Sequence, residues 1–266
     1  SSNNNKPIVN TLIEWNRNSF PWKKMEHPLL QDNGHVLFQG KTQHLFNDHV
    51  VQENVIFPGA GHIDLMLSKS KVSTLTSIVI SRTLPIDVEV VVHEKDGIVE
   101  IVSINDDSKF SSCSTLSNKD TEERKISLEM GLEDAKKRCL IEVDVDWLYK
   151  EAFGSVGLSY GPMFQTIKKI WKSDQGEVVT LIESNHSIQG FRFDPTMLDG
   201  CFQTVALLVS DNTATAGKTF VPYFFELIKT LKPIEGNVSC VGRLFEITSE
   251  KVVSELALYN IAVGCI

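Results

Sequence analysis

Residues 48–69 read DHVVQENVIFPGAGHIDLMLSK and combine a strand-like run with a run of helix formers. The β-branched and aromatic residues of 50–57 predict a strand, and Pro58-Gly59 ends it. The good helix formers of 60–69 predict a helix whose first backbone N–H groups have no acceptor within the helix. An apolar helix that directly follows a strand is therefore the unit from which the first half of the chain is built.

A second apolar helix is predicted for residues 195–209, PTMLDGCFQTVALLV, in the other half of the chain. Helices that are apolar nearly all round are expected to be buried. Asp96-Gly97 between two strand-like runs predicts a hairpin. Further strands are expected at 35–40, 73–84, 87–94, 97–104, 163–173, 177–184, 219–228, 237–247 and 251–260, with a short helix at 144–152. The pattern predicts an α+β fold in which a sheet wraps a central helix, twice over.

Composition narrows the class of protein. The chain has 266 residues, of which 42% are hydrophobic, so it suits one large domain or two small ones. A formal net charge of -8 argues against a nucleic-acid binder. No apolar run approaches the roughly 20 residues that span a bilayer, and the first residues lack the apolar core of a signal peptide. The default expectation is a cytoplasmic protein with no nucleic-acid or membrane partner.

The cysteines and histidines do not predict a metal or disulfide framework. There are 5 cysteines, scattered and without a CxxC pair, so most are expected to be buried thiols. A metal site built from His44, His49 and His62 is conceivable, but their spacing matches no metal-binding signature. No metal is expected.

Changes in composition suggest four segments. Residues 1–26 are rich in Asn and other polar residues and read as a linker or N-terminal tail. Residues 27–116 form the first helix-and-sheet unit and residues 139–266 the second. The charged stretch 117–138 between them is expected to be a solvated connector.

His49 stands at the head of the strand that leads to Pro58-Gly59. A lone histidine is most often a surface residue or a hydrogen-bonded core residue. The helix start that follows favours a functional role, because its free N–H groups and partial positive charge can polarise a carbonyl beside the imidazole. A base next to such a site can remove a proton α to a carbonyl group.

Asp199 and Gln203 are spaced i, i+4 and so share one face of the second helix. The simple interpretation is an aspartate stabilised by the helix dipole, although Asp194 is better placed for that role as the N-cap. The functional interpretation is a carboxylic acid kept protonated by apolar neighbours and oriented by Gln203. Together with His49 as base, such an acid could eliminate water from a β-hydroxy carbonyl compound.

Taken together, these motifs resemble those of a known family, the dehydratase domains of modular polyketide synthases and animal-type fatty acid synthases. HVVQENVIFP resembles the family's HxxxGxxxxP motif, LSYGPMFQ its GYxYGPxFQ stretch, and LDGCFQ its Asp-xxx-Gln motif. The segments that carry the resemblance are 19–30, 49–58, 158–165, 198–203 and 220–231. Several motifs in order at family-like spacing are more specific than any one of them.

The resemblance implies a double-hotdog fold and a hydro-lyase of the 3-hydroxyacyl carrier-protein type. It implies that His49 is the base and Asp199 the acid, that the Gly59 N–H after Pro58 binds the thioester carbonyl, and that Tyr160 and Gln203 support the acid. The substrate would be a β-hydroxyacyl thioester on the phosphopantetheine of an acyl carrier protein, with no free cofactor. Other partners would be neighbouring synthase domains and a second copy of the chain.

One departure from the motif keeps rival functions open. Glu53 stands where the motif has glycine, and a strand running from His49 would place Glu53 on the same face as the imidazole. An inward carboxylate would favour the imidazolium and impair the base, whereas an outward one is harmless. The rivals are a catalytically silent structural or carrier-docking domain, and a related domain that performs double-bond migration or cyclisation with the same residues.

Overall fold

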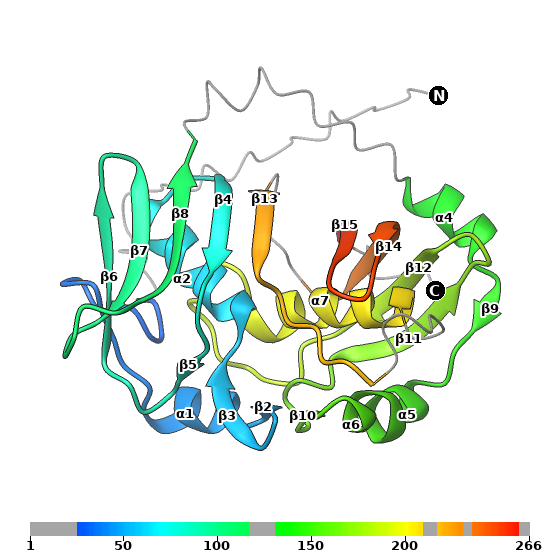
Figure 1. Ribbon diagram of the computed structural model, residues 1–266, viewed down its shortest axis with the longest axis horizontal. Helices are drawn as coiled ribbons and strands as arrows, with labels where there is room; N and C mark the ends of the chain where they lie inside the picture. Colours follow the sequence, from blue (N-terminus) through cyan, green and yellow to red (C-terminus); the bar gives the residue numbers. More distant parts are fainter. Residues whose placement is uncertain (1–25, 117–130, 210–216, 231–235, 261–266) are drawn as a thin grey trace, which may run out of the picture.

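The computed structural model describes residues 26–116, 131–209, 217–230 and 236–260. They form two main antiparallel sheets, with one long helix lying across each (Figure 1). The helices are α2 (Gly59–Ser70) and α7 (Pro195–Val209), and they contact each other at the centre of the molecule. The expected α+β architecture, with a sheet around a helix twice over, is present.

The first sheet contains six strands and covers α2 (Figure 1). In spatial order they are β1 (His35–Val36), β6 (Val90–Lys95), β7 (Ile98–Ser103), β8 (Lys109–Thr115), β4 (Thr74–Ile80) and β13 (Phe224–Lys229). The predicted hairpin at Asp96-Gly97 is confirmed, since both residues have positive φ and Lys95 pairs with Ile98. The edge strand β13 comes from the second half of the sequence, so the two halves share this sheet.

The second sheet contains five strands and packs against α7. In spatial order they are β15 (Val252–Asn260), β14 (Val238–Ile247), β12 (Glu177–Ile182), β11 (Ile167–Lys172) and β9 (Ile141–Glu142). The helix α4 (Leu132–Arg138) lies against β12 and β14, and Arg138 pairs with Glu177 of β12. The end of the segment predicted as a connector is therefore helical, while residues 117–130 lie outside the described residues.

A smaller sheet joins the two halves at the bottom of Figure 1. Its strands are β10 (Leu158–Tyr160), β2 (His49–Val51), β3 (Asn54–Phe57) and β5 (Leu84–Pro85). The short helices around it are α1 (Gly40–Phe46), α5 (Val145–Trp147), the π-helical turn η1 (Leu148–Ala152) and α6 (Phe153–Ser155). Because β10 pairs with β2, the second half of the chain meets the first at His49.

The prediction of a single strand over residues 50–57 is wrong. The segment is a tight hairpin in which Val51 pairs with Asn54 across a turn made by Gln52 and Glu53. Both turn residues have positive φ, 47° and 65°. A two-residue turn of this kind normally uses Asn or Gly, so a Gln-Glu pair gives no turn signal in the sequence.

Both long helices are buried, as predicted. In α2, every residue from Ala60 to Leu67 is buried. Asp194 caps α7, because its Oδ1 accepts hydrogen bonds from the Thr196 N–H at 2.9 Å and the Met197 N–H at 3.4 Å. This confirms Asp194 as the N-cap and leaves Asp199 one turn inside the helix.

A buried hydrogen bond ties the start of the described chain to both halves. His27 Nε2 lies 2.7 Å from Asp64 Oδ2, and the other carboxyl oxygen of Asp64 accepts the Phe193 N–H at 2.8 Å. Asp64 lies on α2, and Phe193 lies just before α7. The side chain of Asp64 therefore holds the segment that leads into α7 against α2. The relative position of α2 and α7 determines where their side chains meet.

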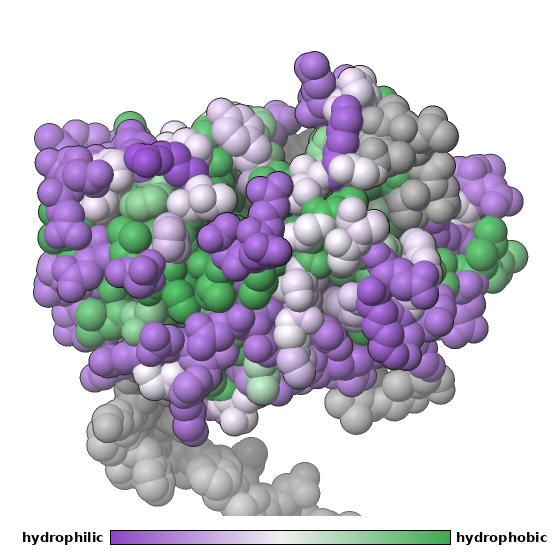
Figure 2. Space-filling view, turned by 60° about the horizontal axis from the view of Figure 1, so that its bottom comes forward, coloured by the Kyte–Doolittle hydropathy of each residue, from purple (hydrophilic) through white to green (hydrophobic). Residues whose placement is uncertain are grey.

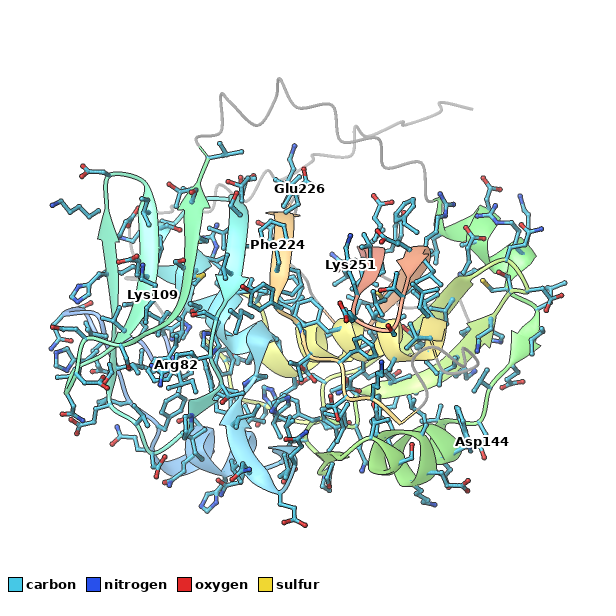
Figure 3. All side chains as sticks on the ribbon, viewed as in Figure 1. Arg82, Lys109, Asp144, Phe224, Glu226 and Lys251 are labelled. Atoms are coloured by element: carbon cyan, nitrogen blue, oxygen red, sulfur yellow. The ribbon has the colours of Figure 1, made fainter. Side chains whose placement is uncertain are left out.

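On the face drawn in Figure 2, hydrophobic patches show between hydrophilic side chains. The exposed large apolar side chains include Val221, Tyr223 and Phe224, exposed by 49%, 64% and 54%. Figure 3 shows Phe224 and Glu226 on β13, which is an edge strand of the six-stranded sheet. No helix in the described part of the chain has the length and apolar character needed to cross a membrane.

Candidate active site

His49 begins β2 and is buried, with 6% of its surface exposed. Its Nδ1 lies 2.9 Å from the carbonyl oxygen of Ile56, across the β2–β3 hairpin. A carbonyl oxygen only accepts hydrogen bonds, so Nδ1 carries the ring proton of the neutral imidazole. The lone pair is then on Nε2, which makes Nε2 the basic atom.

Asp199 on α7 faces that basic atom. Its Oδ1 lies 3.8 Å from His49 Nε2, and its side chain is as buried as the imidazole. Burial raises the pKa of this carboxyl group, while His49 and Gln203 act in the opposite direction. The net rise in pKa favours the protonated form of Asp199, the form that can act as an acid in a proton transfer.

Gln203 holds the carboxyl group in place. Its Nε2 donates to Asp199 Oδ2 at 2.9 Å and to the Phe164 carbonyl at 3.1 Å. Because the amide nitrogen donates to Asp199 Oδ2, the proton of the neutral acid is left on Oδ1, the oxygen nearer His49. The predicted i, i+4 arrangement of Asp199 and Gln203 on one helix face is present.

Tyr149 completes the network, a role that the sequence patterns did not predict. The Tyr149 hydroxyl donates to Gln203 Oε1 at 2.8 Å and accepts the Ile167 N–H at 3.1 Å. Because the Phe164 carbonyl only accepts, it must face the Gln203 amide nitrogen, which leaves Oε1 for the Tyr149 hydroxyl. A tyrosine in the expected helix 144–152 was a visible signal, but only the packing of η1 against α7 gives it a partner.

Tyr160 lies beside His49 as the adjacent residue in the β10–β2 pairing, with ring centroids 5.6 Å apart. Burial, followed by the charge of Asp199, raises the Tyr160 pKa well above its usual value. Its hydroxyl therefore stays protonated and is available as a hydrogen-bond donor on the acid side. The Phe164 ring lies 5.2 Å from the imidazole and covers another side of it.

Pro58 and Gly59 form the start of α2, close in sequence to the Ile56 carbonyl that holds His49. A Cβ on Gly59 would lie 2.9 Å from Ile80 Cδ1 and 3.7 Å from Pro222 Cβ, so the chain around it is tightly packed. As the first residue of the helix, Gly59 has an N–H with no acceptor inside α2. The positive end of the α2 helix dipole therefore lies at Pro58 and Gly59.

Glu53 does not face the imidazole. It is exposed in the hairpin turn, with a φ of 65°. Glycine adopts this backbone conformation at low cost. This gives a physical reason why the family motif has glycine at the position that corresponds to Glu53. The substitution bears on the turn and leaves the surroundings of His49 unchanged.

The three histidines considered as a metal site do not come together. His44 is exposed on α1, and His62 is buried in α2, where its Nδ1 lies 2.7 Å from Ser111 Oγ. Burial lowers the His62 pKa to about 3, so this ring is neutral. Within the described residues, no three His, Cys, Asp or Glu side chains gather as metal ligands. Cys113, Cys139, Cys201 and Cys240 are free and buried, and Cys265 lies outside the described residues.

Residues 127–260 match a protein-family model described as the polyketide synthase dehydratase N-terminal domain. The chain belongs to the polyketide synthase dehydratase family. Among curated proteins, polyketide synthase GfsE from Streptomyces halstedii is 30% identical over 84 residues, which is 30% of this chain and 2% of that synthase. The matched stretch is thus a very small part of the relative.

Solved structures confirm the fold of this member of the polyketide synthase dehydratase family. The dehydratase domain of the CurJ module of the Curacin synthase has a TM-score of 0.67 at 21% identity, covering 88% of this chain and 91% of that one. A dehydratase domain of a mycocerosic acid synthase-like polyketide synthase has a TM-score of 0.70 at 18% identity, with 89% and 92% covered. These relatives are double-hotdog domains, as the sequence predicted.

Two further solved relatives are inactive mutants of the CurK dehydratase of the Curacin synthase. One replaces a histidine by phenylalanine, with a TM-score of 0.65 at 18% identity, and covers 87% of this chain and 92% of that one. The other replaces an aspartate by asparagine, with a TM-score of 0.64 at 18% identity and 86% and 92% covered.

Proposed function

We propose that the chain removes water from a β-hydroxyacyl thioester, giving an α,β-unsaturated thioester. His49 Nε2 takes the α-proton, and the electron pair of that C–H bond forms the new double bond. The C–OH bond breaks as Asp199 Oδ1 protonates the departing hydroxyl, which leaves as water. The imidazolium and carboxylate then return to their starting states by a net proton transfer from His49 to Asp199.

The observation that carries the proposal is the 3.8 Å separation of His49 Nε2 and Asp199 Oδ1. The Ile56 carbonyl leaves Nε2 as the base. Burial raises the Asp199 pKa and favours the acid. The inactive histidine and aspartate mutants of the CurK dehydratase support the same pair of residue types.

The neighbouring groups are proposed to bind the rest of the reacting unit. The Gly59 N–H, at the positive end of α2 and after Pro58, donates a hydrogen bond to the thioester carbonyl oxygen and stabilises the negative charge that develops there. The Tyr160 hydroxyl donates a hydrogen bond toward the departing hydroxyl group. Gln203 holds the carboxyl group of Asp199 in position. Both proton transfers use side chains, so the mechanism requires no bound metal or organic cofactor.

The substrate is proposed to arrive on the phosphopantetheine arm of an acyl carrier protein, because the relatives are domains of polyketide synthases. The carrier protein and neighbouring synthase domains are then partners, and a second copy of the chain is a further one. The acyl chain must reach His49 and Asp199, which are only 6% and 5% exposed. Substrate entry therefore requires a local opening around the site.

Intact-protein mass spectrometry of the acyl carrier tests the proposal. Wild-type protein incubated with a β-hydroxyacyl carrier thioester is expected to lower the carrier mass by one water, and His49→Ala should not. His44→Ala is the matched control, since His44 is exposed on α1. Unchanged mass with several substrates would support a silent domain. Conversion of an unsaturated carrier thioester without mass change would support double-bond migration or cyclisation.

A further inference from the structure

Asp48 makes two hydrogen bonds with a turn in the other half of the chain. Its Oδ2 accepts the Met163 N–H at 2.8 Å, and its backbone carbonyl accepts the Gly161 N–H at 2.8 Å. Asp48 directly precedes His49, the proposed base. The residue therefore connects the backbone that carries the base to residues 161–164.

Gly161 shows how closely the carboxyl group fits this turn. A Cβ on Gly161 would overlap the Cγ and both carboxyl oxygens of Asp48, closer than real Cβ atoms approach other atoms. The turn itself is closed by the Phe164 N–H, which donates to the Gly161 carbonyl at 3.0 Å. The Asp48 side chain thus occupies the space that the absence of a side chain at Gly161 provides.

The other end of this turn reaches the proposed acid. The Phe164 carbonyl accepts from Gln203 Nε2 at 3.1 Å, and the same nitrogen donates to Asp199 Oδ2 at 2.9 Å. The Phe164 ring also lies 5.2 Å from the His49 ring. A displacement of the turn would therefore move Gln203, the acid that it orients, and one wall of the imidazole pocket together.

We propose that Asp48 is a positioning residue that sets the separation of His49 and Asp199 by holding the 161–164 turn. The inference rests on the proposed function, which names these two residues as base and acid. Asp48 acts through its carboxyl oxygen as a hydrogen-bond acceptor and through its shape. It touches neither reacting group of the substrate in this account.

Asn185 supports the outer side of the 161–164 turn independently of Asp48. Loss of the Asp48 side chain should therefore loosen the turn and leave the fold intact. Asn185 Nδ2 donates to the Pro162 carbonyl at 2.7 Å and to the Gln165 carbonyl at 2.9 Å. With Asn185 in place, and with the Gly161 N–H still donating to the backbone carbonyl of residue 48, the turn keeps its closed shape but loses the side-chain hydrogen bond to the Met163 N–H.

Steady-state dehydration kinetics of Asp48→Ala and Asp48→Asn test the role. Asp48→Ala is expected to lower kcat by about 10- to 100-fold, the loss caused by an ångström-scale misplacement of catalytic groups. KM for the carrier thioester and the melting temperature should change little. Asp48→Asn keeps an oxygen acceptor and should retain most of the rate. Asp146→Ala is the matched control, because Asp146 is an exposed aspartate that pairs with Lys150.

Gly161→Ala gives an independent variant in case Asp48→Ala folds poorly. Alone it should clash with Asp48 and lower kcat, whereas the double variant Asp48→Ala/Gly161→Ala should be no slower than Asp48→Ala, since the space is then free. Additive losses in the double variant, a kcat of Asp48→Ala within twofold of wild type, or equal losses in Asp48→Asn and Asp48→Ala would each overturn the inference.

A readout without turnover separates this inference from the proposed function. The NMR signals of the Gln203 side-chain amide report its donation to Asp199 and Phe164. They should shift and exchange faster in Asp48→Ala and remain as in wild type in Asp48→Asn. Unchanged Gln203 signals in Asp48→Ala would overturn the positioning role even if wild-type protein releases no water, and that lack of turnover would count only against the proposed function.

Discussion

The Nε2 atom of His49 and the Oδ1 atom of Asp199 lie 3.8 Å apart, although one residue starts a strand of the first half and the other lies on the central helix of the second. Each partner is held by one hydrogen bond on its far side, His49 by the Ile56 carbonyl and Asp199 by Gln203. The reactive atoms are thereby directed at each other across a buried space. The first two predictions concern residues that maintain this arrangement.

Replacing Tyr149 by phenylalanine removes the hydroxyl that fixes Gln203. Gln203 Oε1 and the Ile167 N–H would lose a partner in a buried region, which costs about 1 to 3 kcal/mol of folding stability. We expect kcat to fall by roughly tenfold, since the acid is no longer held. Urea unfolding measures the change in stability, and the rate at which the acyl carrier loses the mass of one water measures the change in kcat. Tyr223→Phe is the control, as that ring is 64% exposed. A Tyr149→Phe variant equal to wild type in rate would remove Tyr149 from the site.

Replacing Gln203 by methionine should move the pH dependence of the reaction. The hydrogen bond from Gln203 lowers the Asp199 pKa, so its loss raises that pKa further. The rate falls at high pH as the acid loses its proton, and this fall should therefore shift to higher pH in the variant. The pH profile of kcat/KM measures it. A shift to lower pH would contradict the assignment of Asp199 as the acid.

Replacing Glu53 by glycine should stabilise the hairpin and leave catalysis unchanged. A non-glycine residue at a φ of 65° is strained, and relief of that strain should add about 0.5 to 1 kcal/mol to the free energy of unfolding. Asp96→Gly, in the hairpin between β6 and β7 with a φ of 51°, is the matched control far from the site. A change in kcat larger than twofold in Glu53→Gly alone would show that residue 53 acts on the site.

His62 should make the protein less stable as the pH falls. The unfolded chain binds this proton near the ordinary pKa of about 6.5, but the native state binds it only near a pKa of about 3. Unfolding therefore takes up a proton in between, and the free energy of unfolding should drop by about 2 kcal/mol from pH 7 to pH 5 through this group. Urea unfolding at both pH values, with His62→Gln and the exposed His44→Gln as variants, isolates the effect. Equal pH dependence in His62→Gln and wild type would disprove it.

Local signals in the sequence predicted most of the elements. Asp96-Gly97 predicted the hairpin between β6 and β7, and Asp194 predicted the cap of α7. Strand β8 (Lys109–Thr115) was missed, because its run of serines and a cysteine has low β propensity and no alternation of apolar residues. The Gln52-Glu53 turn was missed because neither residue is typical of positive φ.

The proposed base and acid were found from the motifs, but their supporting residues were not. Tyr149 and Asp48 have ordinary local surroundings in the sequence, and their roles depend on contacts between distant segments. Tyr149 reaches α7 only when η1 packs beneath it, and Asp48 reaches Met163 only when β2 pairs with β10. Periodicity and turn chemistry describe single elements, whereas these contacts depend on how the two halves dock.

The central claim is that His49 and Asp199 act on one substrate as base and acid. The most direct measurement is the rate of water loss from a β-hydroxyacyl carrier thioester in wild type, His49→Ala, Asp199→Asn and the double variant. We predict losses of about 100- to 10,000-fold in each single variant, with no further loss in the double variant, because the two residues act as a unit. Water loss near the wild-type rate in either single variant, or fully additive losses in the double variant, would contradict the account.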